Sequence, residues 1–423
     1  MFRNSRIDKT LKITLLVIAL ALCAPLAEAQ QSTYSPYSRY GYGILNEPNF
    51  GNQGAMGGVT AAMREVSNIN PMNPASYSAI DSTTFIFDFA FTGTHSLYEE
   101  NGVTGKAYNF ALDHIAMKFP IAKNWGFSVG LYEFSQTGYS FYDEIPIAGL
   151  DGEDDTYAIS AYSSTGGINN LFVGTAYRFF NHLSVGFNWN YRFGTLQYLN
   201  VLTYPESSEY TKTYTYYMLE LGQSAFQFGL QYEQTFADRH RFVLGGSLTL
   251  PADFDSQNYN MVLVEDTTYR YYDYKYSTPT SFSVGLSYTY DNRLTIAADY
   301  RQQNWSDATY FSRTDTLATS RRLSLGVEYL PRFLGENYFQ VIKYRAGLHY
   351  SDSYIKFAGQ NLREIGFSLG FGLPIHGSRS VLNLSLESDW TLTPRPDQIQ
   401  EYNLKLCVGI LFNESWFVKR RFN

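Results

Sequence analysis

A repeated two-residue alternation constrains the fold of this chain more than any other feature. Over residues 184–194, bulky apolar side chains alternate with Ser, Gly, Asn and Arg. Successive side chains of a β-strand point to opposite faces, so this period predicts a strand. The bulky face comprises Val185, Phe187, Trp189, Tyr191 and Phe193. Similar alternation begins near Phe85, Phe282, Leu323, Ile365 and Tyr402.

The composition of the second face of these segments distinguishes a membrane barrel from a soluble β-sandwich. It is small and polar with few charges, whereas the outer face of a soluble sandwich carries many charged side chains. A mean hydropathy of -0.25 excludes a helical membrane bundle, but alternating strands dilute the apolar signal of a barrel. The pattern therefore predicts an all-β, membrane-spanning antiparallel barrel with lipid outside and a polar or plugged lumen.

About fourteen strands fit the mature chain, an even number as membrane barrels require. Short predicted connections, such as residues 120–124 and 180–182, alternate with long ones, residues 146–166 and 252–279. Residues 331–340 are long for a turn on the short side. We expect strands to begin near Thr83, Ala107, Trp125, Gly167, Ser184, Gln223, Arg241, Thr280, Arg293, Arg321, Ile342, Leu362, Val381 and Glu401.

The N-terminus has the pattern of a secretory signal peptide. Basic residues precede an apolar run at 13–22 that is too short to span a bilayer, and Ala27-Glu28-Ala29 matches a cleavage site. Leu22 before Cys23 argues against lipid attachment. We expect a signal peptide at 1–29, a periplasmic hatch at 30–81, a barrel at 82–412 and a tail at 413–423, with both termini in the periplasm of a Gram-negative cell.

Residues 51–77 show neither a helical nor a strand period and cannot build a core of their own. Three glycines, Gly54, Gly57 and Gly58, permit positive φ and close backbone approach. Pro71 and Pro74 each remove a backbone donor. Such a segment is either disordered or packed inside something larger. The predicted barrel supplies that container, so we expect the segment to plug the lumen.

The third strand breaks the alternation. Its apolar face runs to Leu131, but the same phase then directs Glu133, Ser135 and Thr137 to lipid. A charge facing the bilayer midplane costs about 2–4 kcal/mol. A bulge or kink within residues 134–138 would remove that cost. Alternatively, the strand has already left the membrane at Glu133.

Several functional classes find little support. The formal charge of -7 provides no basic stripe for nucleic acid. Two G-x-S-x-G matches, at 126–130 and 366–370, lie within strands and not at a nucleophile elbow. The pair His349 and Ser351 points to the lumen, away from a lipid substrate. No histidine has a second ligand at metal spacing, so we predict no catalytic, metal or cofactor site.

Surface features suggest contact with the outer membrane. The acidic residues 151–155 suit a loop that meets divalent ions at a lipopolysaccharide surface. Four tryptophans lie near predicted strand ends, where aromatic side chains anchor barrels at the membrane interface. They are Trp125, Trp305, Trp390 and Trp416.

The stretch Gly54-Ala55-Met56-Gly57-Gly58, followed by Asn73-Pro74-Ala75, resembles the hatch of the FadL-like (OMPP1/FadL/TodX) family of outer-membrane long-chain fatty-acid transporters. The resemblance implies a hatch, a kinked third strand that opens sideways, and a surface capture site. Transferred to this sequence, the hatch comprises Gly54, Gly57, Gly58, Asn73, Pro74 and Ala75. The lateral opening comprises Glu133, Phe134, Ser135 and Gly138, and the capture candidates are Met261, Leu263 and Tyr269.

The function implied by the resemblance is passive uptake of hydrophobic small molecules such as long-chain fatty acids, by lateral diffusion through the barrel wall. The expected partners are outer-membrane lipid, lipopolysaccharide and the hydrophobic ligand, with no cofactor. The alternative is a non-transporting barrel that serves as a scaffold or shuttle in a protein secretion or assembly complex. A lipid hydrolase using His349 and Ser351 ranks last.

Overall fold

The computed structural model describes residues 35–415, apart from residues 49, 148–156, 206–209, 265–266, 334, 358 and 394–397. The predicted signal peptide, the acidic loop tip at 151–155 and Trp416 lie outside the described residues, as does the side chain of Tyr269. None of the helices in the described part of the chain has the length and apolar character needed to cross a membrane.

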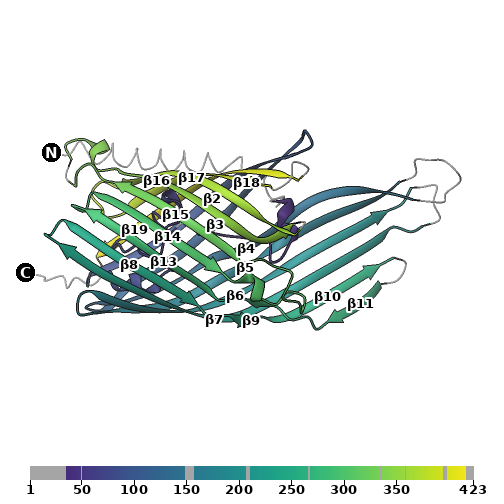
Figure 1. Cartoon of the computed structure of the whole chain (residues 1–423), viewed down its shortest axis with the longest axis horizontal. Helices are drawn as coiled ribbons and strands as arrows, with labels where there is room; N and C mark the ends of the chain where they lie inside the picture. The colour runs from purple at the N-terminus through teal and green to yellow at the C-terminus, as the bar shows by residue number, and fades with distance from the viewer. Residues whose placement is uncertain are drawn as a thin grey trace, which may run out of the picture.

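All but two of the described strands form one antiparallel sheet that closes on itself, and β9 and β12 pair separately (Figure 1). The sheet has seventeen strands, of which β1, β10 and β11 lie outside the closed circuit. Closure joins the first and last barrel strands, with Thr84 opposite Ser415. The prediction of an all-β barrel with about fourteen strands is therefore confirmed.

The fourteen barrel strands run in chain order around the wall, each beside its sequence neighbours. They are β2 (Thr84–Glu100), β3 (Val103–Ala122), β4 (Trp125–Pro146), β5 (Tyr157–Phe179), β6 (Leu183–Thr203), β7 (Thr213–Phe236), β8 (His240–Thr249), β13 (Ser281–Tyr290), β14 (Leu294–Gln303), β15 (Ser320–Tyr329), β16 (Lys343–Phe357), β17 (Gln360–Pro374), β18 (Val381–Leu392) and β19 (Gln400–Ser415).

The two faces of the wall follow the alternation in the sequence. Outward side chains such as Leu244 and Leu325 are 60% and 56% exposed, whereas the inward Asn188 is fully buried. Polar side chains thus line the interior of the barrel, where the plug described below supplies many of their hydrogen-bond partners. This arrangement is the inverse of a soluble sandwich and suits an apolar solvent outside.

One end of the barrel carries tight turns. The φ angles are positive at Phe180 and Asn181, at Ala237 and Asp238, and at Asp291 and Asn292. Two consecutive residues with positive φ are typical of the type I′ turns that suit strand twist. The connection between β15 and β16 is the long exception at this end and includes the short helix η6 (Tyr338–Gln340).

The predicted long connections at the opposite end are wrong in extent. Most of residues 146–166 is strand, because β5 starts at Tyr157. Residues 252–279 contain β9 (Ala252–Asp253), β10 (Asp255–Leu263), β11 (Thr267–Tyr272) and β12 (Ser277–Thr278), and the hairpin β10–β11 extends the sheet beside β7. These parts carry polar and aromatic side chains on both faces, so the sequence lacks the alternation that marks lipid-facing strands.

The barrel interior is occupied by residues 35–81, which we call the plug segment (Figure 1, purple). It contains η2 (Pro36–Arg39), β1 (Ile44–Leu45), η3 (Gly54–Met56) and η4 (Pro74–Ser78). Its backbone contacts the inner wall closely, since a Cβ atom at Gly347 would lie 2.0 Å from the backbone nitrogen of Gly57. The wall lysine Lys118 is fully buried and donates to the carbonyl oxygens of Val66 (3.1 Å), Ala79 (3.2 Å) and Asn68.

Trp305 differs from its predicted role at the membrane interface. It lies in η5 (Trp305–Asp307) with 1% exposure and packs in an aromatic cluster with Tyr42 and Tyr354 inside the barrel. Its Nε1 donates to Gln303 Oε1 at 2.9 Å. A position near a strand end does not specify whether the next residues turn outward or over the lumen. Trp125 and Trp390 are exposed, at 41% and 38%.

The contact at Gly57 yields a first prediction. Gly57 has φ +70°, and an added Cβ would meet the carbonyl oxygens of Leu348 and Leu325 at 2.6 and 2.8 Å. We expect Gly57→Ala to destabilise the docked plug by about 1–3 kcal/mol, because a packed backbone must shift. The measurement is the rate at which protease cleaves the plug segment in detergent.

Gly377→Ala is the matched control for this prediction. Gly377 has φ +75°, but a Cβ there meets no described atom within 4 Å. The control thus carries the same backbone strain without the collision. Equal cleavage rates in the two variants would contradict the docking of Gly57 on the wall.

Candidate functional site

The hydrogen-bonded wall splits between β3 and β4. These two strands pair only from His114 opposite Tyr132 to Ala122 opposite Trp125. Beyond that point β3 still pairs with β2 as far as Val103, and β4 still pairs with β5 as far as Pro146. Within the described structure, residues 103–113 of β3 and residues 133–146 of β4 therefore do not pair with each other. We call this interval the β3–β4 seam.

A β-bulge marks the point where the seam begins. Along the β4–β5 pair, Glu133 lies opposite Asn169 and Ser135 opposite Ile168, which leaves Phe134 as the extra residue. The bulge changes the phase of the strand, so that Ser135 and Thr137 are fully buried and do not face lipid. A bulge within residues 134–138 is one of the two alternatives that the sequence left open.

The Phe134 bulge also redirects two side chains at the start of the seam. The Phe134 ring is half-buried, with the Arg192 guanidinium 4.4 Å from its centroid. The Glu133 carboxylate accepts a hydrogen bond from Asn46 Nδ2 at 3.3 Å. A charge that regular strand geometry would direct to hydrocarbon is bound to the plug segment instead.

Plug residues satisfy the edge of β4 that β3 leaves free. In β1, Ile44 and Leu45 pair antiparallel with Gln136 and Ser135. Flanking bonds run from Asn46 N to Phe134 O at 2.9 Å and from Ser35 N to Gly138 O at 3.0 Å. This pairing was not predictable, because residues 30–50 show neither helical nor strand period.

One side-chain bond crosses the seam directly. Asn109 Nδ2 on β3 donates to Gln136 Oε1 on β4 at 3.1 Å. Gly43 lies against the same stretch of β4 with φ +88°, and a Cβ there would lie 2.2 Å from Gln136 O. The opening is thus closed by the plug and by a polar contact, both of which can be broken without unfolding a strand.

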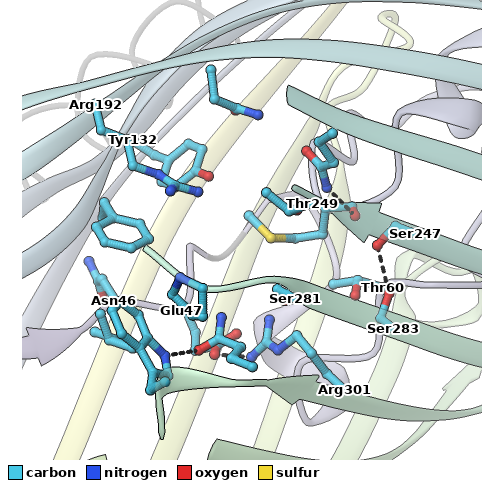
Figure 2. Close-up of a pocket in the computed structure, with 18 residues that line it drawn as sticks. Asn46, Glu47, Thr60, Tyr132, Arg192, Ser247, Thr249, Ser281, Ser283 and Arg301 are labelled. Carbon is cyan, nitrogen blue, oxygen red and sulfur yellow. Dashed lines mark hydrogen bonds and ion pairs between the residues drawn. The ribbon is translucent and has the colours of Figure 1, made fainter. Parts of the chain in front are cut away.

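Two cavities lie between the plug and the wall, with volumes of about 90 and 150 Å³. Leu45, Glu47 and Arg301 contribute to both. The smaller one reaches the seam at Tyr132 and Phe134 (Figure 2). Ligand pockets usually measure about 300–1,000 Å³, so neither cavity accommodates a fatty acid in this conformation.

An ion pair divides the two cavities. The carboxylate of Glu47 contacts the guanidinium of Arg301, and both point into the space shown in Figure 2. Burial opposes ionisation of Glu47, but the positive charges of Arg301 and Arg322 outweigh it and lower the Glu47 pKa. The lumen at this level is therefore charged and polar.

The hatch residues inferred from the resemblance form two groups, which dock on different parts of the barrel wall. Asn73 donates from Nδ2 to Ala61 O (2.6 Å), Leu230 O (3.3 Å) and Gly246 O (3.2 Å), and its Oδ1 caps η4 by accepting from Ala75 N. Pro74 occupies the first turn of η4, where its missing N–H is not needed.

The other half of the motif docks on the opposite wall. Gly57 N donates to Ser368 Oγ at 2.9 Å, and the Gly58 Cα lies where a Cβ would contact Arg322. Gly54 opens η3 and is buried. Asp299 on β14 accepts from the backbone N–H groups of Ala61 (2.6 Å) and Thr60. Glycines permit the approach, and wall side chains hold the plug by its backbone.

The proposed capture residues lie apart from these cavities. Met261 lies opposite Tyr269 in the β10–β11 hairpin, and Leu263 is opposite Thr267. Met261 and Leu263 are half-exposed, and neither lines the two cavities. The structure thus separates Met261 and Leu263 from both cavities.

The pair His349 and Ser351 does not form a nucleophilic arrangement. Both line the larger cavity, but the structure records no hydrogen bond between these two described residues. His349 Nε2 instead faces Glu364 Oε1 at 3.1 Å and Asp389 Oδ1 at 3.5 Å. The carboxylates occupy the side of the ring that a hydrolase would present to serine.

Comparison with known proteins places the chain in a family. No curated protein matches it. The model of the family described as BamG matches residues 10–423, almost the whole chain. The chain belongs to the BamG family.

Solved structures share the barrel fold of this BamG-family protein. The toluene transporter TbuX of Ralstonia pickettii superposes with a TM-score of 0.55 at 15% identity, covering 90% of this chain and 99% of TbuX. The toluene transporter TodX of Pseudomonas putida gives 0.54 at 16%, covering 89% and 98%. A FadL homologue of Pseudomonas aeruginosa gives 0.57 at 10%, covering 86% and 98%. At such identities the likeness establishes a FadL-like barrel fold and nothing further.

Asn73 generates a second prediction. Removing its side chain leaves three carbonyl oxygens without this donor and removes the cap of η4. We expect Asn73→Ala to weaken plug docking by about 1–3 kcal/mol. Hydrogen exchange of residues 60–78 in detergent measures the effect. Asn68→Ala is the control, because the Asn68 side chain makes one long bond, to Glu65 at 3.4 Å; similar exchange in both variants would contradict the anchoring role of Asn73.

Proposed function

We propose that this BamG-family protein carries hydrophobic small molecules, such as long-chain fatty acids, passively across the outer membrane through the β3–β4 seam. The observation that supports this most is the Phe134 bulge, which starts a break in backbone pairing that the plug segment covers. In a closed wall every strand would pair along its length, since unsatisfied backbone groups in lipid are costly. A break covered by a separate, removable segment is a means of lateral passage.

In this proposal Glu133, Phe134, Ser135 and Gly138 form the lateral opening. Residues 35–46 of the plug segment are the gate, and both chain termini lie in the periplasm. The half-exposed Met261 and Leu263, with Tyr269, make the first contact with ligand at the cell surface. The outward faces contact lipid, and the distal strand ends contact lipopolysaccharide. No enzymatic step is assigned.

Because the cavities are small, this function requires part of the plug segment to move. With about 90 and 150 Å³ available beside the plug, passage needs movement of β1 away from β4. Movement of β1 must break its two strand pairs, their flanking bonds and the Asn109–Gln136 contact. It must also break side-chain contacts of residues 35–47, among them Thr137 Oγ1 to Ser38 O, Asn46 Nδ2 to Glu133 Oε2 and the Glu47–Arg301 pair. Each hydrogen bond contributes about 1 kcal/mol net, so the cost of opening grows with the number of contacts that break together.

A second candidate is a non-transporting barrel that serves as a scaffold or shuttle in an outer-membrane secretion or assembly complex. The name of the matching family, BamG, and the polar, filled lumen favour it. A scaffold tolerates a plug that never moves, whereas a transporter requires movement. The two functions are therefore separated by an experiment on the plug.

Locking the plug tests whether movement is needed. Leu45 and Ser135 are directly opposite, and antiparallel partners lie about 4.5–5.5 Å apart at Cα, within reach of a disulfide. We expect oxidised Leu45→Cys/Ser135→Cys protein to lose uptake of a labelled fatty acid and to regain it on reduction. Each single-cysteine variant is a control. Full uptake by the locked protein would overturn lateral transport, and undiminished outer-membrane protein secretion or assembly in cells that carry only the locked protein would favour the scaffold.

Deleting Phe134 tests the bulge itself. Without it, Glu133 and Ser135 remain opposite Asn169 and Ile168, so the β4–β5 pairing becomes continuous and Ser135 still faces inward. The deletion is combined with Glu133→Leu to avoid a charge in lipid. We expect a folded barrel with several-fold lower uptake, because β3 and β4 can then pair. Glu133→Leu alone and Phe134→Ala keep the bulge and serve as controls; uptake equal to theirs would contradict the proposal.

A further inference from the structure

Three metal-ligating side chains converge on one point of the inner wall, apart from the seam. His349 is on β16, Glu364 on β17 and Asp389 on β18, and these strands are neighbours. Gly366 lies opposite both His349 and Asp389, so His349, Gly366 and Asp389 form a row across the sheet. Glu364 precedes Gly366 by two residues and shares its face. Sequence spacing cannot reveal this set, because each ligand comes from a different strand.

Gly366 makes room for two of these side chains at the centre of the row. A Cβ atom there would lie 2.0 Å from His349 Cε1 and 2.4 Å from Asp389 Oδ1. The histidine and aspartate thus lean over the glycine toward each other.

The separations of the donor atoms match a shared cation. His349 Nε2 lies 3.1 Å from Glu364 Oε1 and 3.5 Å from Asp389 Oδ1, and all three atoms lie within 4.8 Å of one another. Ligands bound tetrahedrally at 2.0–2.2 Å are separated by about 3.4 Å. Both carboxylates face the same ring nitrogen. A single proton on that nitrogen satisfies the two carboxylates less completely than a divalent ion does.

His114 provides a contrast within the same barrel. It also lies between two carboxylates, but Asp113 contacts its Nδ1 (2.8 Å) and Asp88 contacts its Nε2 (3.4 Å). Opposite nitrogens point away from each other and cannot share one ion. That arrangement is an ion-pair bridge, whereas the arrangement at His349 is convergent.

The charge and hydrogen bonding of Asp389 also favour a bound cation. Its side chain is 2% exposed, and Oδ1 has no hydrogen-bond partner in the described structure. Oδ2 is paired with Lys405 Nζ at 3.0 Å, which leaves Oδ1 as the atom directed at the cluster. Glu387, 8% exposed, adds another carboxylate to the wall of the same cavity. A buried, unsatisfied carboxylate oxygen beside a convergent nitrogen and carboxylate is the environment that a cation stabilises.

The cavity of about 150 Å³ gives access to the cluster. His349 and Asp389 have side chains only 4% and 2% exposed, but the Glu364 side chain is 33% exposed. An ion can therefore enter past Glu364 and lose its water to the two buried ligands.

We propose that His349 Nε2, Glu364 Oε1 and Asp389 Oδ1 form a binding site for a divalent first-row cation such as Zn²⁺. One imidazole and two carboxylates are ligands that suit these ions, and three protein ligands leave a position for water or a small anion. The site joins β16, β17 and β18 on the lumen side. It does not depend on transport or on movement of the plug.

Cobalt binding provides a direct test. The full-length protein, purified in detergent with a tag that contains no histidine and treated with chelator, is titrated with Co²⁺, and the visible absorption of the bound ion is recorded. We expect binding of a single ion per chain that Zn²⁺ displaces. His349→Gln and Asp389→Asn, which preserve side-chain size, should each lower the affinity by at least about tenfold. Heat-modifiable mobility on unboiled gels verifies that each variant is folded.

His376→Gln is the matched control, because His376 is an exposed histidine in a turn. It should bind Co²⁺ as the unaltered protein does. Absence of stoichiometric binding by folded protein, or unchanged affinity in folded His349→Gln, would overturn the site and leave His349 as an ion-pair partner of Glu364 and Asp389. Fatty-acid uptake is measured separately, so loss of this site and loss of the proposed function are distinguishable.

Discussion

The satisfaction of backbone hydrogen bonds in a solvent that offers none underlies this structure. A lipid-embedded strand must pair on both sides, and the β19–β2 contact extends that pairing around the circuit. The β3–β4 seam is the exception among the described strands. There the plug segment supplies the missing partners to residues 134–138, so the same segment fills the lumen and completes the wall. Disturbing one of these roles disturbs the other.

The plug is held by polar and apolar contacts together. Asp299 and Ser368 accept hydrogen bonds from its N–H groups, and Lys118 donates to its carbonyl oxygens. Its buried side chains, among them Tyr42, Phe50 and Tyr77, pack in apolar clusters with the wall. Such anchoring fixes a chain that cannot form a core of its own.

The outward-facing alternation made the barrel class and strand number predictable, because lipid imposes one simple rule on each strand. Gly54, Gly57 and Gly58 marked a segment that needed a container, and Glu133 marked a break in the third strand. The β10–β11 hairpin and the inward turn of Trp305 were not predictable, since no bilayer constrains those parts. Nor was the convergence of His349, Glu364 and Asp389, because register across three strands is invisible in a linear sequence.

The contacts between the plug segment and wall residues such as Lys118 have a consequence for biogenesis. The plug segment precedes the barrel strands in the sequence and is synthesised before them, yet its partners include Glu233 on β7, Asp299 on β14, Lys343 on β16 and Ser368 on β17. Its final conformation therefore requires a nearly finished barrel, and contacts of such long sequence separation form slowly. The segment must remain extended and soluble while the wall forms around it. Its abundance of Gly, Asn and Ser thus serves the period before folding as well as the folded state.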